Sequence, residues 1–207
     1  MLSLDGRWCL VYAIVGYLAG GILFCDLLLR GLKRVDVYRA AEDGNPGAHN
    51  AFRLGGFWCG LGTLLGDLAK GFFPVWLCLR RLDGLSPLSL TLLAPVLGHA
   101  FPPGRRGGKA ITASFGALLG LLPRRRPLLL LAACYLFFSL LAVIRPHDIR
   151  SITTYLTFAL LCLLLVPEAP LRTGCCLISG VVVCKHLNPI LKRQVKAHEQ
   201  EGIDPIL

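Results

Sequence analysis

Charged residues are scarce in this chain. Only 16% of its 207 residues are Asp, Glu, Lys or Arg, against about 25% in an ordinary soluble domain, and the mean hydropathy is +0.63. So little charge cannot cover the surface of a soluble globule of this length. The composition therefore excludes an ordinary soluble protein and favours one that lies in a membrane.

Acidic residues are the scarcest charged group. The chain has 12 Asp and Glu against 22 Lys and Arg, which gives a net charge of +10. These basic residues are scattered over short loops beside apolar stretches and form no basic domain, so we expect no nucleic-acid partner. Membrane topology and attraction to anionic lipids account for most of them, and membrane lipids are therefore expected partners.

Motifs for metal, redox or covalent acyl chemistry are also missing. None of the 9 cysteines forms a C-x-x-C pair, and the 5 histidines lack ligand spacing. Most of the cysteines lie in or beside apolar stretches, where small buried apolar residues are the simpler interpretation. Neither G-x-S-x-G nor a Cys-His signature occurs. We therefore expect no metal, no cofactor and no covalent enzyme nucleophile.

Long apolar blocks dominate what the chain does contain. They cover residues 10–29, 57–79, 85–97, 111–122, 128–144, 151–166 and 171–184. A helix needs about 20 apolar residues to cross the hydrocarbon core, and three of these blocks are shorter. We expect an all-α, polytopic integral membrane protein with about seven transmembrane helices, some of them short, as a single domain over residues 1–207. The first block ends without a small-residue cleavage site, so we interpret it as a retained helix.

The distribution of Lys and Arg predicts an orientation. With seven spans, loops 30–56, 98–110 and 145–150 and the C-terminal tail share one side and carry 14 of these residues, Lys192, Arg193 and Lys196 among them, against 7 opposite. The positive-inside rule places the richer side in the cytoplasm. We therefore expect the N-terminus outside and the C-terminus in the cytoplasm. The triplet Arg124–Arg126 on the opposite side argues mildly against this.

Three polar breaks on the expected cytoplasmic side carry more than charge. They cover residues 39–53, 98–109 and 185–188, and the second ends in Gly107-Gly108-Lys109 directly before an apolar block. Successive glycine amides at the start of a helix, together with a lysine, can hold a phosphate, although Gly-Gly-Lys alone also suits an ordinary turn. Asp67 and Lys70 lie inside the second apolar block, where they either form a structural pair or orient the loops of a site.

These segments resemble a known family. G-N-P-G-A-H-N-A-F-R-L-G-G at 44–56, D-L-A-K-G at 67–71, L-G-H-A-F-P at 97–102 with G-G-K at 107–109, and K-H-L-N at 185–188 occur in the order found in the bacterial acyl-phosphate:glycerol-3-phosphate acyltransferases, the PlsY family. The resemblance implies transfer of an acyl group from fatty acyl phosphate to the 1-hydroxyl of glycerol 3-phosphate. The products would be lysophosphatidate and phosphate, in the first step of phospholipid synthesis.

The resemblance also implies roles for individual residues. Lys109, His186 and Asn188 are the expected catalytic residues, with either His186 or a substrate phosphate oxygen accepting the proton of the attacking hydroxyl. Gly107, Gly108 and Lys109 would hold the acyl phosphate, whereas Arg39, Lys109, His186 and Asn188 would bind glycerol 3-phosphate. The remaining expected substrate-binding residues are Asn45, Gly47, Asn50, Arg53, His99 and Ser114.

Departures from the family pattern keep an alternative open. The first span lacks the usual serine, Asp43 and His49 stand where serine and threonine are usual, the loop before Gly107 is about two residues short, and Ala110 replaces a glycine. A catalytically silent relative that binds lipid or phosphate, or that scaffolds another membrane enzyme, is therefore the second hypothesis. A small transporter is less favoured, because the chain shows no internal repeat with paired broken spans.

Overall fold

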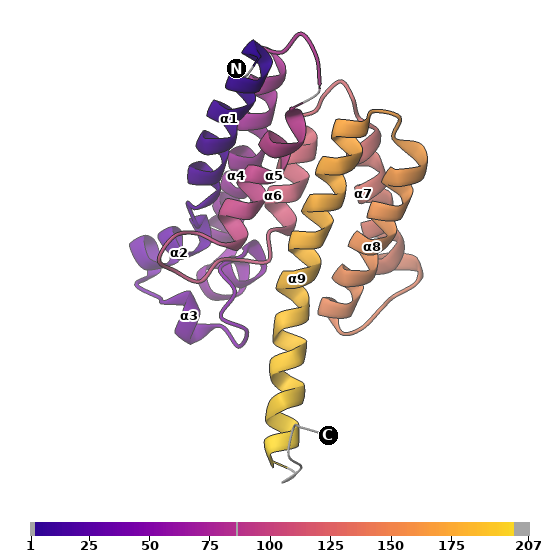
Figure 1. Ribbon diagram of the computed structural model, residues 1–207. Coiled ribbons are helices and arrows are strands. Elements are labelled where there is room, and N and C mark those ends of the chain that lie inside the picture. The colour runs from indigo at the N-terminus through magenta and orange to yellow at the C-terminus, as the bar shows by residue number, and fades with distance from the viewer. Residues whose placement is uncertain (1–2, 86, 201–207) are drawn as a thin grey trace.

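Helices make up all the regular secondary structure of this computed structural model, which describes residues 3–85 and 87–200, the side chains of 192–200 excepted (Figure 1). The α-helices are α1 Leu4–Gly20, α2 Phe24–Leu28, α3 Val37–Ala40, α4 Ala48–Leu79, α5 Leu88–Ala100, α6 Ile111–Leu119, α7 Arg126–Leu136, α8 His147–Leu165 and α9 Ala169–Gln200. Two π-helical turns, η1 Leu29–Lys33 and η2 Phe137–Leu141, extend α2 and α7. The predicted all-α class is confirmed.

Large apolar side chains cover the outside of this helix bundle. Trp58 and Leu141 are each 78% exposed and Leu164 is 70% exposed, which water would disfavour and lipid would not. In the described part of the chain, three helical stretches are long and apolar enough to cross a membrane: Leu4–Lys33, His147–Leu165 and Ala169–Leu191. Two further stretches, Leu88–Ala100 and Arg126–Leu141, are shorter but equally apolar in character.

The expected first span is not one continuous helix. It breaks between Gly20 and Phe24, so residues 10–29 form parts of α1, α2 and η1. The break lies where α1 and α5 cross closely: a Cβ on Gly20 would lie 2.3 Å from the carbonyl oxygen of Pro95, and one on Gly98 would lie 2.1 Å from that of Tyr17. The pair Gly20-Gly21 at this point has low helix propensity, which hydropathy alone does not reveal.

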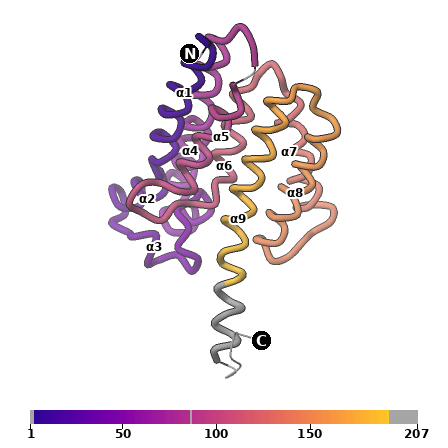
Figure 2. Tube along the Cα trace, in the orientation of Figure 1, coloured from indigo at the N-terminus to yellow at the C-terminus, as the bar shows by residue number. Residues whose placement is uncertain are grey.

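The last span also differs from expectation. Residues 171–184 lie in α9, but this helix continues to Gln200, beyond the expected end at Cys184. Lys185, His186 and Asn188 were expected in a tail and lie instead in the same continuous helix, α9, which runs along the bundle (Figure 2). The side chains of Lys192, Arg193 and Lys196, counted above for the orientation, lie outside the described residues.

The two ends of the bundle differ in chemistry. Asp5, in the first turn of α1, accepts a hydrogen bond from the Gly84 amide at 3.1 Å, so the N-terminal end and the α4–α5 loop lie together. The opposite end carries α2, α3, the loop before α6 and the extension of α9 (Figure 1). The polar breaks at 39–53, 98–109 and 185–188 therefore meet at one end of the bundle. The predicted topology, which places all three on the same side of the membrane, requires this arrangement.

Candidate active site

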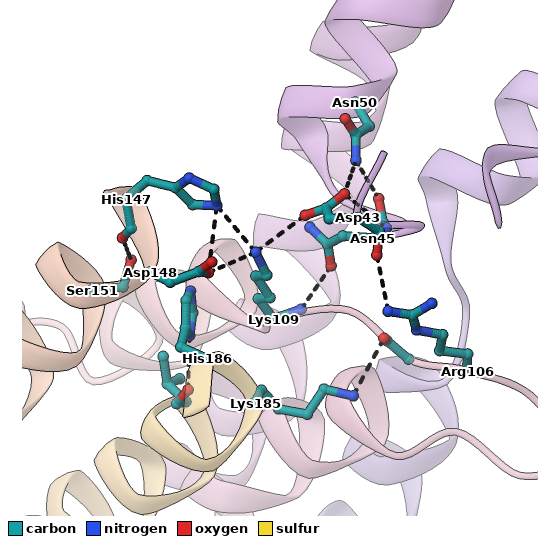
Figure 3. A network of polar contacts seen from close by, with 12 residues as sticks. Asp43, Asn45, Asn50, Arg106, Lys109, His147, Asp148, Ser151, Lys185 and His186 are labelled. Carbon is teal, nitrogen blue, oxygen red and sulfur yellow. Dashed lines mark hydrogen bonds and ion pairs between the residues drawn. The ribbon is translucent and has the colours of Figure 1, made fainter. Parts of the chain in front are cut away.

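Lys109 lies at the centre of a polar network at this end of the bundle. Its Nζ lies 2.8 Å from Asp148 Oδ1, 3.1 Å from Asp43 Oδ2 and 3.1 Å from His147 Nε2 (Figure 3). Asp43 comes from the loop before α4, whereas His147 and Asp148 begin α8. The network therefore holds the Lys109 side chain between two carboxylates, where three segments of the chain meet.

The loop before α4 is bonded both internally and to Lys109. The Asn50 side-chain amide donates to Asp43 Oδ1 at 2.9 Å and to the Asn45 carbonyl at 2.8 Å, and the Asn45 N–H donates to Asp43 Oδ1 at 3.1 Å. The Lys109 N–H in turn donates to Asn45 Oδ1 at 3.1 Å. Asn45 and Asn50 thus fix the shape of this loop against the Gly-Gly-Lys segment.

Asp43 is charged because of these bonds. Burial by itself would raise the pKa of this carboxyl group. The donors from Asn50 and Asn45 and the charge of Lys109 outweigh that effect and lower the pKa of Asp43 to about 2. An aspartate at this position, where the resembled family usually has serine, therefore forms a permanent ion pair with Lys109 at neutral pH.

The glycines before Lys109 pack against the end of α5. A Cβ on Gly107 would lie 2.2 Å from the Ala100 carbonyl oxygen, and one on Gly108 would lie 2.1 Å from His99 Nε2. The Gly108 amide also donates to the His99 carbonyl at 2.9 Å. Neither position has room for a side chain. Ala110, which stands where the family has a glycine, has a φ of 62°, a left-handed conformation that costs an alanine about 1–2 kcal/mol.

A buried cluster lies behind this loop. Lys70 Nζ lies 2.7 Å from each of three acceptors: Asp67 Oδ1, the Ile22 carbonyl oxygen and His99 Nδ1. The Asp67, Lys70 and His99 side chains are at most 3% exposed. The broken helix between α1 and α2 makes this cluster possible, because a continuous helix would use the Ile22 carbonyl itself.

Two hollows share Lys109. The main cavity, of about 370 Å³, also contains Asn45, Gly47, Asn50, His99 and His186 in its wall. The basic hollow, of about 270 Å³, is lined by Asp43, Asn45, Arg106, Gly107, Lys109, Lys185, Asn188 and Pro189. Polar groups from distant parts of the sequence therefore converge on two adjoining spaces, of which the second has three basic side chains around it.

Most of the residues expected from the sequence reach these spaces, but Gly108, Ser114, Arg39 and Arg53 line neither one. Ser114 is buried and bonded to the Ile111 carbonyl at 2.7 Å and to the Tyr155 hydroxyl. Arg39 is exposed on α3. Arg53 is bonded to Glu42 at 3.2 Å on the exposed side of α4.

His147 and Asp148 were missed by the sequence analysis. They follow Pro146 in a six-residue stretch that was interpreted only through its two arginines. The available signal was a polar pair directly after proline and directly before an apolar block, which is typical of a helix start. Such a pair is as suited to capping a helix as to building a site, so only its position beside Lys109 reveals the second role.

Comparison with known proteins agrees with this geometry. Residues 10–195 match the family model described as glycerol-3-phosphate acyltransferase. The chain is 36% identical to the glycerol-3-phosphate acyltransferase of Geobacter sulfurreducens over 84% of this chain and 87% of that protein. It is 32% identical to that of Methylobacillus flagellatus over 88% of this chain and 91% of that protein.

Solved structures also resemble the fold of this chain. The crystal structure of PlsY, an integral membrane glycerol 3-phosphate acyltransferase, in its glycerol 3-phosphate form superposes with a TM-score of 0.76 and 26% identity. The match covers 91% of this chain and 92% of that one. The lysophosphatidic acid form gives a TM-score of 0.74. With the ordered motifs, the membrane helices and these matches in agreement, the chain belongs to the glycerol-3-phosphate acyltransferase family.

Proposed function

We propose that this chain transfers a fatty acyl group from acyl phosphate to the 1-hydroxyl of glycerol 3-phosphate, releasing lysophosphatidate and inorganic phosphate. The observation that carries the proposal is the position of Lys109 between two adjoining hollows. Both substrates bear phosphate, and one cation at their junction can contact the leaving phosphate of the donor as well as the acceptor.

The two hollows suit different substrates. In the basic hollow, Arg106, Lys109 and Lys185 surround a space that also includes Asn188, and this set of donors matches the phosphate of glycerol 3-phosphate. The main cavity adds Ile111 and Tyr135 to its polar wall, which suits a donor with a polar head and an apolar chain. Arg39 and Arg53 lie outside both spaces, so we propose that they act on the approaching glycerol 3-phosphate.

The reaction needs no covalent intermediate, because the acyl phosphate is already activated. The hydroxyl oxygen attacks the acyl carbonyl carbon, the bond from that carbon to the phosphate oxygen breaks, and phosphate leaves with the bonding electron pair. Lys109 and the amide of Gly107 would stabilise the charge on the departing phosphate, whereas the Gly108 amide holds the loop through its bond to the His99 carbonyl. The hydroxyl proton must pass to an acceptor within hydrogen-bonding reach.

His186 suits the role of proton acceptor. This side chain is fully buried in the wall of the main cavity, and its Nδ1 lies 2.8 Å from the Val182 carbonyl oxygen. A carbonyl only accepts hydrogen bonds, so Nδ1 carries the proton and Nε2 of the neutral ring is an acceptor. His186 Nε2 has no partner among the described residues. We therefore propose that His186 Nε2 accepts the proton of the attacking hydroxyl.

The location follows from the substrates and the charge distribution. Glycerol 3-phosphate is a soluble metabolite, whereas the acyl chain belongs in lipid, so the site must lie at a membrane surface. The positive-inside distribution supports the plasma membrane of a bacterium, with the end that carries Lys109 facing the cytoplasm. We also propose that residues 1–207 act as one domain, because the site draws on segments from residue 43 to residue 188.

The test is an assay of the purified protein in detergent. Phosphate release from palmitoyl phosphate is measured with and without glycerol 3-phosphate, and palmitoyl-CoA is offered as an alternative donor. The proposal predicts acceptor-dependent phosphate release and formation of palmitoyl-glycerol 3-phosphate. Turnover with palmitoyl-CoA alone would contradict the proposed donor, and a folded protein without turnover of either donor would favour the catalytically silent relative.

A further inference from the structure

The two buried histidines of the main cavity have opposite hydrogen-bonding environments. His186 has a carbonyl oxygen at Nδ1, whereas His99 has the Lys70 ammonium at Nδ1, 2.7 Å away. Both side chains are at least 97% buried, so their protonation pattern is set by these partners and not by water. The two rings therefore present different chemistry to the same cavity.

Lys70 fixes His99 in one tautomer. An ammonium has three hydrogens to donate and no lone pair, and Lys70 Nζ has three acceptors at 2.7 Å, of which His99 Nδ1 is one. We take Lys70 as the ammonium of its 2.7 Å ion pair with Asp67. Nδ1 of His99 must therefore accept, and the proton of the neutral ring lies on Nε2. His99 Nε2–H is a donor with no acceptor among the residues that the structure describes.

Gly108 packs directly against this donor. A Cβ at position 108 would lie 2.1 Å from His99 Nε2, which is closer than any side chain can approach. His99 belongs to the wall of the main cavity, and Gly108 directly precedes Lys109. Because Gly108 has no Cβ, the donor lies between the backbone of the Gly-Gly-Lys segment and the main cavity, where the head of an acyl donor is proposed to lie.

We infer that His99 is a catalytic residue whose Nε2–H stabilises the oxyanion formed at the acyl carbonyl, and that Lys70 is the positioning residue that aims it. When the hydroxyl attacks the carbonyl carbon, the carbonyl π electrons move to oxygen, and this oxygen receives the hydrogen bond from His99. The electrons return as the bond to the leaving group breaks, while the hydroxyl proton passes to His186. One neutral histidine thus donates and the other accepts.

This inference rests on acyl transfer to glycerol 3-phosphate and not on the identity of the donor. Attack on an acyl phosphate, a thioester or any other activated acyl group passes through the same tetrahedral oxyanion. The proposed donor and the proposed role of His99 can therefore fail separately. The assay uses whichever of palmitoyl phosphate and palmitoyl-CoA the wild-type protein turns over.

Two substitutions of His99 give opposite predictions for catalysis and for loop support. His99→Gln places an amide nitrogen near the position of Nε2 but loses the acceptor for Lys70, whereas His99→Asn keeps an acceptor near Nδ1 and removes the donor. An oxyanion donor predicts that His99→Asn lowers kcat about 100-fold or more with little change in KM, and that His99→Gln recovers most of that loss. If His99 only holds the loop through Lys70, His99→Asn will instead be the more active variant, and the inference is overturned.

Two further readouts complete the test. A rise in KM without a fall in kcat in His99→Asn would assign Nε2–H to substrate binding and would also overturn the inference. The tautomers are read directly by ¹⁵N NMR of histidine-labelled protein, with the His99→Gln and His186→Gln variants used to assign the signals. We expect a protonated Nε2 in His99 and a protonated Nδ1 in His186. A protonated Nδ1 in His99 would contradict the inference whether or not the variants remain folded.

Discussion

The Lys109 ammonium lies 2.8 Å from the carboxylate of Asp148, which is only 1% exposed. Asp148 stands in the first turn of α8, where the helix dipole favours a negative charge. The ion pair joins the loop before α6 to the start of α8, two segments that the sequence separates by 39 positions. Lys109 therefore points toward both hollows because Asp148 holds it from one side and Asp43 from the other.

Replacing Asp148 should impair catalysis without unfolding the protein. In Asp148→Asn, Lys109 keeps Asp43 as a partner but loses a charge-assisted bond of about 1.5–3 kcal/mol. We expect acceptor-dependent acyl transfer to fall by roughly 10-fold or more. Asp83→Asn, at an exposed carboxylate at the other end of the bundle, is the control. Equal activity of the two variants would show that Asp148 does not orient Lys109.

A methyl group at position 108 should be harmful for a steric reason. Gly108→Ala would place its Cβ 2.1 Å from His99 Nε2, so either the loop or the ring must move. We expect a large loss of activity together with a lower melting temperature in detergent. The matched control is Gly180→Ala on the exposed side of α9, where no atom lies within 4 Å, and where alanine favours the helix by about 0.5–1 kcal/mol. If the Gly108→Ala protein keeps the activity and the melting temperature of the wild type, the tight contact between Gly108 and His99 is refuted.

Asp43 should make the folded protein sensitive to strong acid. Its pKa is about 2 in the folded chain, against an ordinary value of 3.8, so its charge stabilises the fold above pH 4 by about 2 kcal/mol. This contribution is lost as the pH falls through 2. The stability difference between wild type and Asp43→Asn, measured by thermal unfolding in detergent, should therefore be present at pH 7 and shrink toward pH 2. A difference that does not change over this range would contradict the assignment.

The sequence predicted helices better than it predicted their breaks and ends. Long apolar runs fix where helices lie, so α4 through α8 fall close to the expected blocks. The break after Gly20 lies where α1 packs closely against Pro95 on α5, and no pattern within residues 10–29 reveals a partner 75 positions away. The end of α9 was missed because hydropathy falls after Cys184 and because Pro189, which lies inside the helix, ordinarily indicates a helix end.

The sequence predicted only those site residues that belong to a recognisable motif. Gly107, Gly108 and Lys109 stand out because a glycine pair and a lysine interrupt an apolar chain. Asp148 does not, because a single acid at the start of a helix is ordinary. Its role depends on which loop lies opposite, and that is a property of the packed bundle.

The topology can be tested by cysteine accessibility in a cysteine-free background. Ala40→Cys and Pro103→Cys lie on exposed positions at the end that carries Lys109, and Asp83→Cys lies at the other end. We expect the first two positions to react with an impermeant reagent only from the cytoplasmic side, and the third only from outside. Labelling of positions 40 and 103 from opposite sides would be incompatible with a shared site.

The most direct measurement compares Lys109→Ala with Arg124→Ala in glycerol 3-phosphate-dependent phosphate release from palmitoyl phosphate. Arg124 is exposed beside the hollow at residues 123–127, away from both site hollows, and its loss removes the same charge. We predict that Lys109→Ala lowers the rate roughly 10- to 150-fold in protein that stays folded, and that Arg124→Ala changes it little. Equal losses in the two variants would contradict the assignment of Lys109 as the phosphate-binding centre of the site.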